Sequence, residues 1–450
     1  MTDRVAVRFE GAGVSEAELS WGQQEMWSVI QAKGSSLAFG TIQTLPAGQT
    51  AADVATGLRF IMSRHQSLRT TLRFDLDGHV RQVVHPRGEI MLDVVDAGDG
   101  DPGQAAAALA AGYKSSDFDY EHEWPLRIGV ITWRGAATHV VKVLCHIAVD
   151  AFGLAALDDD FDLRGKRTGP VTALQPVEQA RWQHGPRGAG AHEASMRYFE
   201  RLAANVPGPQ FSQGANPRTP RFWQAIFESP AGYRAARMVA ARWGTSTSPV
   251  LLAAFAVALR PFTRRGQVAV DVVVSNRFRP GFADSVSTVA QSSLCVIDVA
   301  GIPFGEIVRC TWRSALDAYK HAYYDVAGMA EVRKQASAER GGALELDVLF
   351  NDRRVRSRAL ADGVDLAGCG PLPPLRDELS RTVLTWGERS DSPEEKVSLY
   401  LRDTPGTLCC ELWADTHFVG PADMESLLRR IENVLVDAAL EVPGYQDTSY

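Results

Sequence analysis

Apolar residues recur with two different periods along the chain, and the two periods predict both helices and strands. Val54, Leu58 and Ile61 recur at the spacing of a helix that buries one face. Two apolar runs, at residues 126–133 and 138–144, are typical of β-strands, with an Arg-Gly turn between them. The first half of the chain is therefore expected to combine amphipathic helices with a strand pair.

The same patterns predict further elements along the whole sequence. Helices are expected at residues 20–30, 105–113, 152–161, 193–204, 250–259 and 424–435. Strands are expected at residues 267–275, 291–299 and 344–350, and as hairpins at residues 74–84 and 397–413. Mixed elements in both halves indicate an α/β fold, of the α+β sandwich kind, with two similar lobes whose sheets are rich in antiparallel pairs. No internal sequence repeat is readable.

One segment rich in glycine is the best candidate for a linker. Residues 184–191 contain three glycines and a proline, a composition typical of a connection between domains. The sequence therefore predicts a first lobe at residues 1–183 and a second lobe at residues 192–450.

Composition narrows the class of protein and of partner. The chain has 450 residues, of which 45% are hydrophobic and 22% charged, which is globular composition. A net charge of −7 without a basic stripe argues against nucleic acid as a partner. No apolar stretch reaches the roughly 18 residues of a membrane span, and the first ten residues lack the apolar core of a signal peptide. We therefore expect a cytoplasmic protein with no membrane partner.

The cysteines point to buried thiols and away from a metal site. They form no C-x-x-C pair and show no zinc-ligand spacing. The six cysteines are at positions 145, 295, 310, 369, 409 and 410.

The candidate chemistry lies between the strand at 138–144 and the helix that follows it. His146 comes at the exit of the strand and Asp150 follows four positions later, so the imidazole could enter a cleft while the carboxylate holds the loop. The spacing alone is a weak signal. His321 and Asp325 repeat it in a helix-like stretch, where it makes an ordinary surface pair.

Four short motifs resemble the core motifs of condensation domains of nonribosomal peptide synthetases. Residues 20–27, SWGQQEMW, resemble S-x-A-Q-x-R-L-W, and residues 64–72, RHQSLRTTL, resemble R-H-E-x-L-R-T-x-F. Residues 145–151, CHIAVDA, resemble H-H-x-x-x-D-G, with Cys145 for the first histidine and Ala151 for the glycine. Residues 275–291 resemble a further motif, with glutamine where asparagine is usual. The four motifs occur in the family's order over most of the chain.

The resemblance implies a fold and a reaction. It implies two chloramphenicol-acetyltransferase-like lobes in a V-shaped pseudo-dimer, with the reaction centre between them. Phosphopantetheine arms of carrier proteins, peptidyl or acyl, would enter a tunnel from opposite faces. The chain has no room for adenylation or carrier domains, so we expect a free-standing enzyme with no permanently bound cofactor. It would form an amide or ester between a carrier-bound acyl or aminoacyl thioester and a small-molecule or carrier-bound acceptor in natural-product biosynthesis.

The resemblance also implies roles for single residues. His146 would be the base or the positioning group for the nucleophile. Asp150 would form a structural ion pair with Arg277, for which Arg279 is the competing partner. Two further residues, Gln291 and Ser292, are candidates for the wall of the tunnel.

The two departures from the central motif carry separate expectations. Cys145 is expected to be buried filler that points away from the side of His146, although it too is a candidate for lining the tunnel. Ala151, the other motif candidate for the tunnel, would be strained if its position required a positive φ. Arg64 and Arg69 are expected in structural ion pairs.

Three other functions fit the sequence. The departures at Cys145 and Ala151 fit a catalytically degenerate module that binds carrier proteins or recruits partner enzymes. An epimerase-type relative would use His146 to move an α-proton. An acyltransferase that uses coenzyme A directly would need only the H-x-x-x-D pattern.

Overall fold

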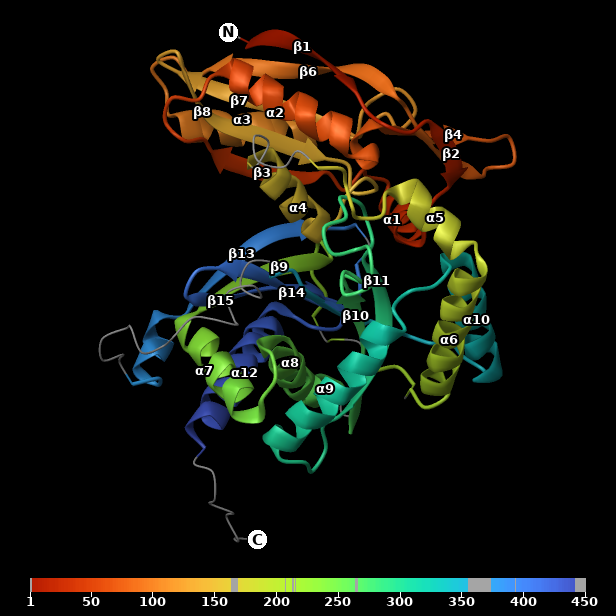
Figure 1. The fold of residues 1–450 in the computed structure, drawn as a ribbon. Helices are drawn as coiled ribbons and strands as arrows, with labels where there is room; N and C mark the ends of the chain where they lie inside the picture. Colours follow the sequence, from red (N-terminus) through yellow and green to blue (C-terminus); the bar gives the residue numbers. More distant parts are fainter. Residues whose placement is uncertain are drawn as a thin grey trace. The chain divides into compact units, whose positions relative to one another are not determined.

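The computed structural model of the protein describes residues 2–441, apart from 163–168, 207, 213, 215, 264–265, 355–373 and 393. The chain divides into two compact units, both of mixed α/β structure (Figure 1). The first unit comprises the described residues of Met1–Ala191 and of Ser275–Gln291. The second comprises the described residues of His192–Val274 and of Ser292–Tyr450. The lobe limits expected from the sequence stay a prediction.

The first unit contains a five-stranded sheet and a smaller, three-stranded sheet. In spatial order the large sheet contains β1 (Thr2–Glu10), β6 (Arg87–Asp96), β7 (Leu126–Trp133), β8 (Ala136–Leu144) and β3 (Phe39–Thr44). All neighbours are antiparallel except the parallel pair β6–β7. The small antiparallel sheet contains β2 (Ser15–Glu18), β5 (Val80–Val84) and β4 (Thr70–Phe74).

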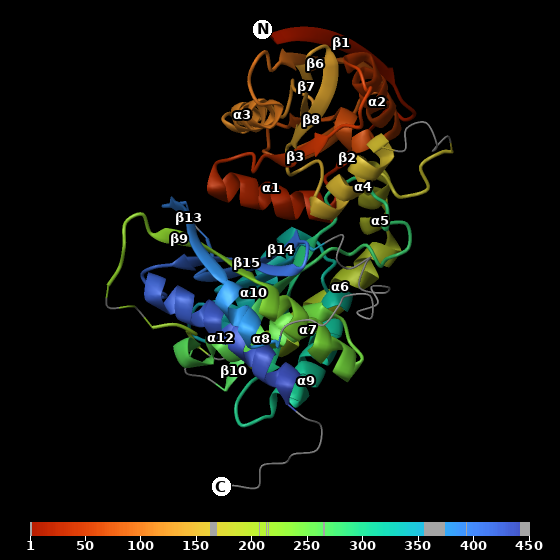
Figure 2. The ribbon, with the colours of Figure 1, turned by 90° about the vertical axis from the view of Figure 1, so that its left-hand side faces the viewer.

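Helices cover both faces of the large sheet. The helices and the short 3₁₀ helix of this unit are α1 (Trp21–Lys33), α2 (Ala51–Arg64), η1 (Gln66–Arg69), α3 (Pro102–Lys114), α4 (Ala151–Asp162) and α5 (Pro176–Gln183). Apolar side chains of α2 and α4 form one core with β7 and β8, whereas α3 packs on the opposite face (Figure 2). The apolar faces of the helices thus pack against the apolar side chains of the strands.

The first two helices begin at capping residues. Ser20 and Thr50 each accept a hydrogen bond from the backbone N–H three residues on, in α1 and α2 respectively. The side chains of Gln23 and Asp53 accept a hydrogen bond from the N–H of the capping residue, which completes a capping box at both helices. Local hydrogen bonds therefore define where each helix begins.

The second unit is built on a seven-stranded sheet. In spatial order its strands are β11 (Gln291–Asp298), β10 (Gln267–Val274), β12 (Val348–Asp352), β14 (Val397–Thr404), β15 (Thr407–Asp415), β9 (Phe222–Ser229) and β13 (Val383–Ser390). The pairs β10–β12 and β12–β14 are parallel, and the pairs from β14 to β13 are antiparallel.

Helices also lie on both faces of this sheet. One face packs against α7 (Pro230–Trp243), α8 (Thr247–Thr263), α9 (Phe304–Lys320) and α12 (Pro421–Leu440). The other face packs, at β10 and β11, against α6 (Pro186–Ala203) and α10 (Val326–Glu339). A further 3₁₀ helix, η3, covers Asp377–Arg381. The nearly all-apolar run at residues 250–259 is buried inside the first of these cores, as predicted.

One prediction about local structure is wrong, and the linker stays a prediction. Residues 186–191, inside the predicted linker, are the first turns of α6, and the division between the two units falls after Ala191. A Cβ at Gly188 would lie 1.9 Å from the Gln183 carbonyl oxygen, so the glycine permits a close helix contact. His321 and Asp325 do not share a helix, because His321 follows α9 and Asp325 caps α10.

Residues 275–291 belong to the first unit, although they lie in the second half of the sequence. Val286 is buried in the core formed by α2, α4 and the large sheet. The Gln179 amide of α5 donates to the hydroxyl oxygens of both Ser285 and Ser287, at 2.8 Å each. The Leu174 N–H donates to the Gly281 carbonyl at 2.8 Å. We call residues 275–291 the inserted segment.

Buried charges fix α4 to its surroundings. The Arg64 Nε donates to the Asp160 carboxylate at 2.8 Å, and the His65 Nε2 lies 2.9 Å from the same oxygen. The buried ammonium of Lys142 pairs with Asp158, two residues closer to the start of α4, at 2.5 Å. Helix α4 is therefore held by ion pairs as well as by its apolar face.

The expected ion pairs are present for one of the two motif arginines. Arg64 pairs with Asp160, as predicted. Arg69 is buried and instead donates to the backbone carbonyl oxygens of Ala12, Gly13 and His85. Burial lowers the pKa of the Arg69 guanidinium. The sequence could not indicate this, because carbonyl acceptors are supplied by every residue type.

Among the described residues, no single helix has the length and apolar composition of a membrane span. Helices α7 and α8 meet that test only when taken together, and they are bent by 111°.

We predict that Asp160→Asn destabilises the first unit in a pH-dependent way. Burial opposes ionisation, but the bonds from His65 and Arg64 outweigh it and lower the pKa of Asp160 to about 2. The stabilisation is thus complete above the unfolded pKa, roughly 3.9, and is lost as the pH falls toward 2. Denaturant unfolding at pH 7 should show a loss of about 3–5 kcal/mol, the usual effect of breaking a buried pair from one side.

The matched control is Asp159→Asn, an exposed carboxylate on the same helix. It should change the free energy of unfolding by less than about 0.5 kcal/mol. A wild-type advantage over Asp160→Asn that stays constant between pH 5 and pH 2.5 would contradict the prediction.

Candidate active site

His146 lies directly after β8, in the loop that leads into α4. Its ring packs on the ring of Phe39 in β3, with centroids 4.6 Å apart. The antiparallel register pairs Phe39 with Leu144, so β3 carries the aromatic ring to the exit of β8. The His146 N–H points to the Ser36 carbonyl at 3.4 Å, and the His146 carbonyl accepts a 2.7 Å bond from the Thr288 hydroxyl. The imidazole is therefore carried by a backbone that is held on both sides.

Asp150 is buried in the first unit, where its carboxylate has several partners. Both of its oxygens pair with the Arg277 guanidinium, at 2.9 Å each, and both side chains are more than nine-tenths buried. The Gly153 N–H, in the first turn of α4, donates to Asp150 at 2.8 Å. The Val289 and Ala290 N–H groups donate at 3.0 and 3.1 Å. The carboxylate thus caps α4 and holds two parts of the inserted segment.

The guanidinium of Arg277 makes further hydrogen bonds beyond its ion pair, although its Nε is buried without a hydrogen-bond partner among the described residues. Its Nη2 also donates to the carbonyl oxygens of Ser285 and Ser287, at 2.9 and 3.1 Å. Arg279, the competing candidate, donates to the Asn276 side chain at 3.1 Å. The structure therefore assigns the ion pair with Asp150 to Arg277.

The backbone at Ala151 does not have the positive φ that would strain an alanine. It is the first residue of α4, and it is absent from the described non-glycine residues with positive φ, which are Leu37, Arg134 and Asn276. A helix start accepts alanine without cost, so the condition under which strain was expected at this position is not met.

Cys145 lies in the interior of the first unit. Its side chain is fully buried in an apolar cluster, with the sulfur 3.8 Å from the Ser36 carbonyl oxygen. Burial raises the pKa of the Cys145 thiol to about 12. The thiolate is the nucleophilic form of cysteine, so this environment argues against a Cys-His nucleophile.

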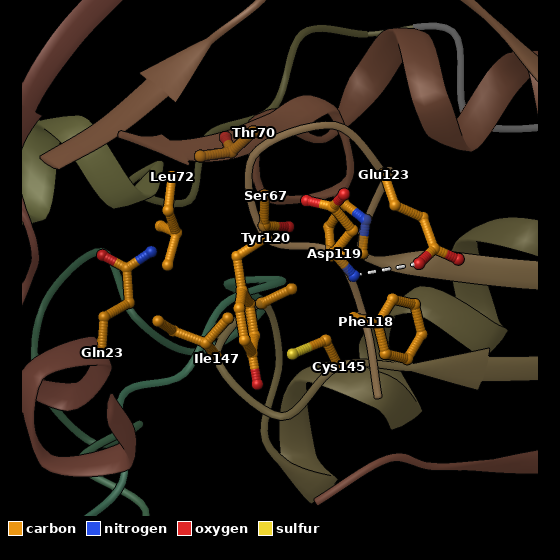
Figure 3. Close-up of a pocket in the computed structure, with 12 residues that line it drawn as sticks. Gln23, Ser67, Thr70, Leu72, Phe118, Asp119, Tyr120, Glu123, Cys145 and Ile147 are labelled. Carbon is orange, nitrogen blue, oxygen red and sulfur yellow. Dashed lines mark hydrogen bonds between the residues drawn. The ribbon is translucent and has the colours of Figure 1, made fainter. Parts of the chain in front are cut away.

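A small cavity borders Cys145 (Figure 3). Its volume is about 20 Å³, and its walls include Gln23, Ser67, Leu72, Phe118, Tyr120 and Ile147. Substrate pockets are usually about 300–1,000 Å³, so this cavity cannot hold an acyl group and its pantetheine arm.

The remaining candidates lie at the start of β11. Gln291 is buried and is the first residue of the strand. The carbonyl oxygen of Ser292 accepts a 2.8 Å bond from the Tyr324 hydroxyl. A role for either residue in lining a tunnel stays a prediction.

The described residues hold no group of three or more His, Cys, Asp or Glu side chains that could bind a metal ion. Four of the five described cysteines are buried and Cys310 is exposed, while Cys369 lies outside the described residues. The site can therefore offer an imidazole, hydroxyl groups and backbone groups for chemistry.

Sequence reasoning missed the residues that hold His146. Ser36, Phe39 and Thr288 lie outside the H-x-x-x-D pattern, and Thr288 is 142 positions away from His146. No local pattern could have found Thr288, whereas the pairing of β3 with β8 could have suggested Phe39.

A family model described as Condensation domain matches residues 15–358. Curated relatives include chondramide synthase of Chondromyces crocatus, 25% identical over 321 residues, which are 67% of this chain and 8% of the relative. Isonitrile lipopeptide synthase of Mycobacterium tuberculosis is 25% identical over 333 residues, 67% of this chain and 13% of the relative. The chain thus spans about a tenth of the length of these relatives.

Several solved structures share the fold over nearly the whole chain. The condensation domain of the monacolin K polyketide synthase MokA matches with a TM-score of 0.72 and 16% identity, covering 96% of this chain and 99% of that one. The condensation domain of the enacyloxin polyketide synthase matches at 0.71 and 22%, covering 96% and 84%. An X-domain solved in complex with OxyB from teicoplanin biosynthesis matches at 0.67 and 16%, covering 96% and 95%. The predicted two-lobed, chloramphenicol-acetyltransferase-like fold is confirmed.

We predict that the ion pair between Asp150 and Arg277 stabilises the first unit strongly. Arg277→Met should lower the free energy of unfolding by about 3–5 kcal/mol, because it leaves a buried carboxylate without its counter-charge. Asp150→Asn combined with Arg277→Met should cost less than the sum of the two single changes. Denaturant unfolding of the four proteins measures this coupling. Arg279→Met is the control, and an equal loss in that variant would contradict the assignment.

We predict that Cys145 resists alkylation in the folded protein. At pH 8, iodoacetamide should label Cys310 rapidly and Cys145 only after denaturation, because thiolate formation and access are both suppressed at Cys145. Peptide mapping by mass spectrometry reads both sites in one sample. Labelling of Cys145 at the rate of Cys310 would contradict the burial argument.

Proposed function

Because this chain belongs to the condensation-domain family, we propose that it joins a carrier-bound acyl or aminoacyl group to an amine or an alcohol. In this proposal the donor is a thioester on the phosphopantetheine arm of a peptidyl or acyl carrier protein, which is a separate partner. The acceptor is a small molecule or a second carrier-bound group.

The observation that carries the proposal is the placement of His146. Its ring packs on Phe39, and both its backbone N–H and its carbonyl face fixed partners. A general base must meet its proton at hydrogen-bond distance, so a held imidazole is what the reaction needs. The pKa of an ordinary histidine, about 6.5, suits proton uptake near neutral pH.

The proposed reaction is acyl transfer through a tetrahedral intermediate. The acceptor nitrogen attacks the thioester carbonyl carbon, and His146 takes a proton from that nitrogen as the C–N bond forms. When the intermediate collapses, the C–S bond breaks and the imidazolium returns the proton to the leaving thiolate. Amine and thioester thus give amide and thiol, and the atoms balance without another reactant.

Asp150 has a structural part in this proposal. Two oxygens that accept four hydrogen bonds, one from Arg277 and three from backbone N–H groups, and that make a second ion-pair contact with Arg277 have little capacity left for a proton relay. Its contribution is to fix the loop that carries His146 and the start of α4.

Two features weaken the reading as a degenerate recruitment module. The departure at Ala151 falls at an ordinary helix start, and the departure at Cys145 falls in a buried cluster. Neither change removes the groups that hold His146. Because an X-domain of this fold has been solved in complex with OxyB, recruitment of a partner protein is one of the outcomes that the test below distinguishes.

We predict that His146→Ala lowers turnover by about 10²–10⁴-fold, the usual contribution of a general base. Carrier proteins loaded with a panel of aminoacyl groups are offered together with amine and alcohol acceptors, and products are measured by liquid chromatography and mass spectrometry. The carrier is supplied as a separate protein, so the assay also tests supply of the donor by a separate partner.

His321→Ala is the matched control, because it removes the histidine of the other H-x-x-x-D sequence. It should leave turnover unchanged. Wild-type turnover in His146→Ala would refute the proposed role of the imidazole. Coenzyme A thioesters that replace the loaded carrier at equal kcat/KM would indicate direct use of coenzyme A. Scrambled stereochemistry without bond formation would indicate epimerisation, and carrier binding without any product would indicate recruitment.

A further inference from the structure

The hydroxyl of Thr288 reaches the backbone of the candidate base. Its Oγ1 donates a 2.7 Å hydrogen bond to the His146 carbonyl oxygen. Thr288 is 1% exposed, so water does not compete for this bond. The contact joins the inserted segment to the histidine itself, whereas the ion pair of Asp150 reaches only the end of the same loop.

Thr288 is itself held in place from the opposite side. Helix α1 approaches so closely that a Cβ at Gly22 would lie 2.3 Å from the Thr288 carbonyl oxygen. On the next residues, the Val289 and Ala290 N–H groups bind Asp150. A residue whose backbone is fixed in this way presents its hydroxyl from a defined position.

The other backbone bond of His146 is the weaker of the two. Its N–H lies 3.4 Å from the Ser36 carbonyl oxygen, near the limit for a hydrogen bond, compared with 2.7 Å for the Thr288 contact. In the peptide after His146, the carbonyl accepts the hydrogen bond from the Thr288 hydroxyl and the Ile147 N–H bonds to the Cys145 sulfur, so the Thr288 hydroxyl is one of the groups that set the orientation of this peptide. A rotation of that peptide would also displace the Cα–Cβ bond of His146, and with it the ring that packs on Phe39.

We propose that Thr288 is a positioning residue for His146, acting through the histidine carbonyl and not through substrate. The inference rests on the proposed function, since it assigns Thr288 a part in placing the base of that reaction. Its simpler competitor is that Thr288 only satisfies a buried carbonyl and so contributes to stability alone.

Two variants separate these readings. Thr288→Val keeps the shape of the side chain and removes the donor, whereas Thr288→Ser keeps the donor and removes a methyl group. Turnover is measured with the loaded carrier and acceptor found productive for the wild type, well below the unfolding temperature of each variant. The folded fraction from circular dichroism corrects each rate.

We expect Thr288→Val to lower kcat per folded molecule by about 10–100-fold with KM nearly unchanged, because a misplaced base loses rate in the chemical step. Thr288→Ser should restore kcat to within about threefold of wild type, since it keeps the hydroxyl. A second readout needs no substrate. Diethylpyrocarbonate should modify His146 severalfold faster in Thr288→Val than in wild type and Thr288→Ser, as mapped by mass spectrometry.

The outcomes distinguish the inference from the function on which it rests. Wild-type turnover in His146→Ala refutes the proposed function. Loss of turnover in His146→Ala with wild-type kcat in Thr288→Val refutes only the positioning inference. A lowered unfolding temperature in Thr288→Val with unchanged kcat per folded molecule refutes it too, as does a folded Thr288→Ser variant that fails to recover. If no donor proves productive, an unchanged modification rate at His146 in Thr288→Val overturns the inference.

Discussion

The buried ion pair between Asp150 and Arg277 is the constraint on which the candidate site depends. Removing two charges from water costs several kcal/mol for each ion, and a buried pair compensates only when its other hydrogen-bonding groups are satisfied. Here the guanidinium fork meets both carboxylate oxygens, and three backbone N–H groups complete the acceptor. The pair can therefore join the start of α4 to two distant parts of the inserted segment without leaving a charge uncompensated.

In this arrangement Asp150 holds the loop in place, and His146 is the group that can react. The carboxylate of Asp150 is engaged in structural bonds. The ring of His146, four residues earlier, contacts the ring of Phe39 and takes no part in the ion pair. This division of roles also explains why two departures from the family motif leave the site intact. Ala151 needs only a helical backbone, and Cys145 contributes to an apolar cluster in the interior of the first unit.

Local chemistry allowed much of the fold to be predicted from the sequence. The recurrence of apolar residues in α2, the apolar runs of β7 and β8, and the turn at Arg134 and Gly135 all depend on neighbours within a few residues. Local patterns could not predict that the inserted segment belongs to the first unit, since Arg277 lies 127 positions from its carboxylate, and only the resemblance led us to expect that pair. The helical structure of residues 186–191 could not be predicted from composition either. Glycine at position 188 serves a close contact with Gln183, and composition cannot distinguish contact from flexibility.

The position of the inserted segment along the histidine loop is fixed by three consecutive residues that contact this loop. Thr288 binds the His146 carbonyl, and the next two N–H groups bind Asp150. An extended chain advances about 3.3 Å per residue, so a shift by one residue would break all three bonds at once. It would also move the Thr288 carbonyl into α1 or away from it, at the point where Gly22 permits a close approach. One alignment of the segment therefore satisfies the carboxylate, the histidine carbonyl and the packing of α1 together.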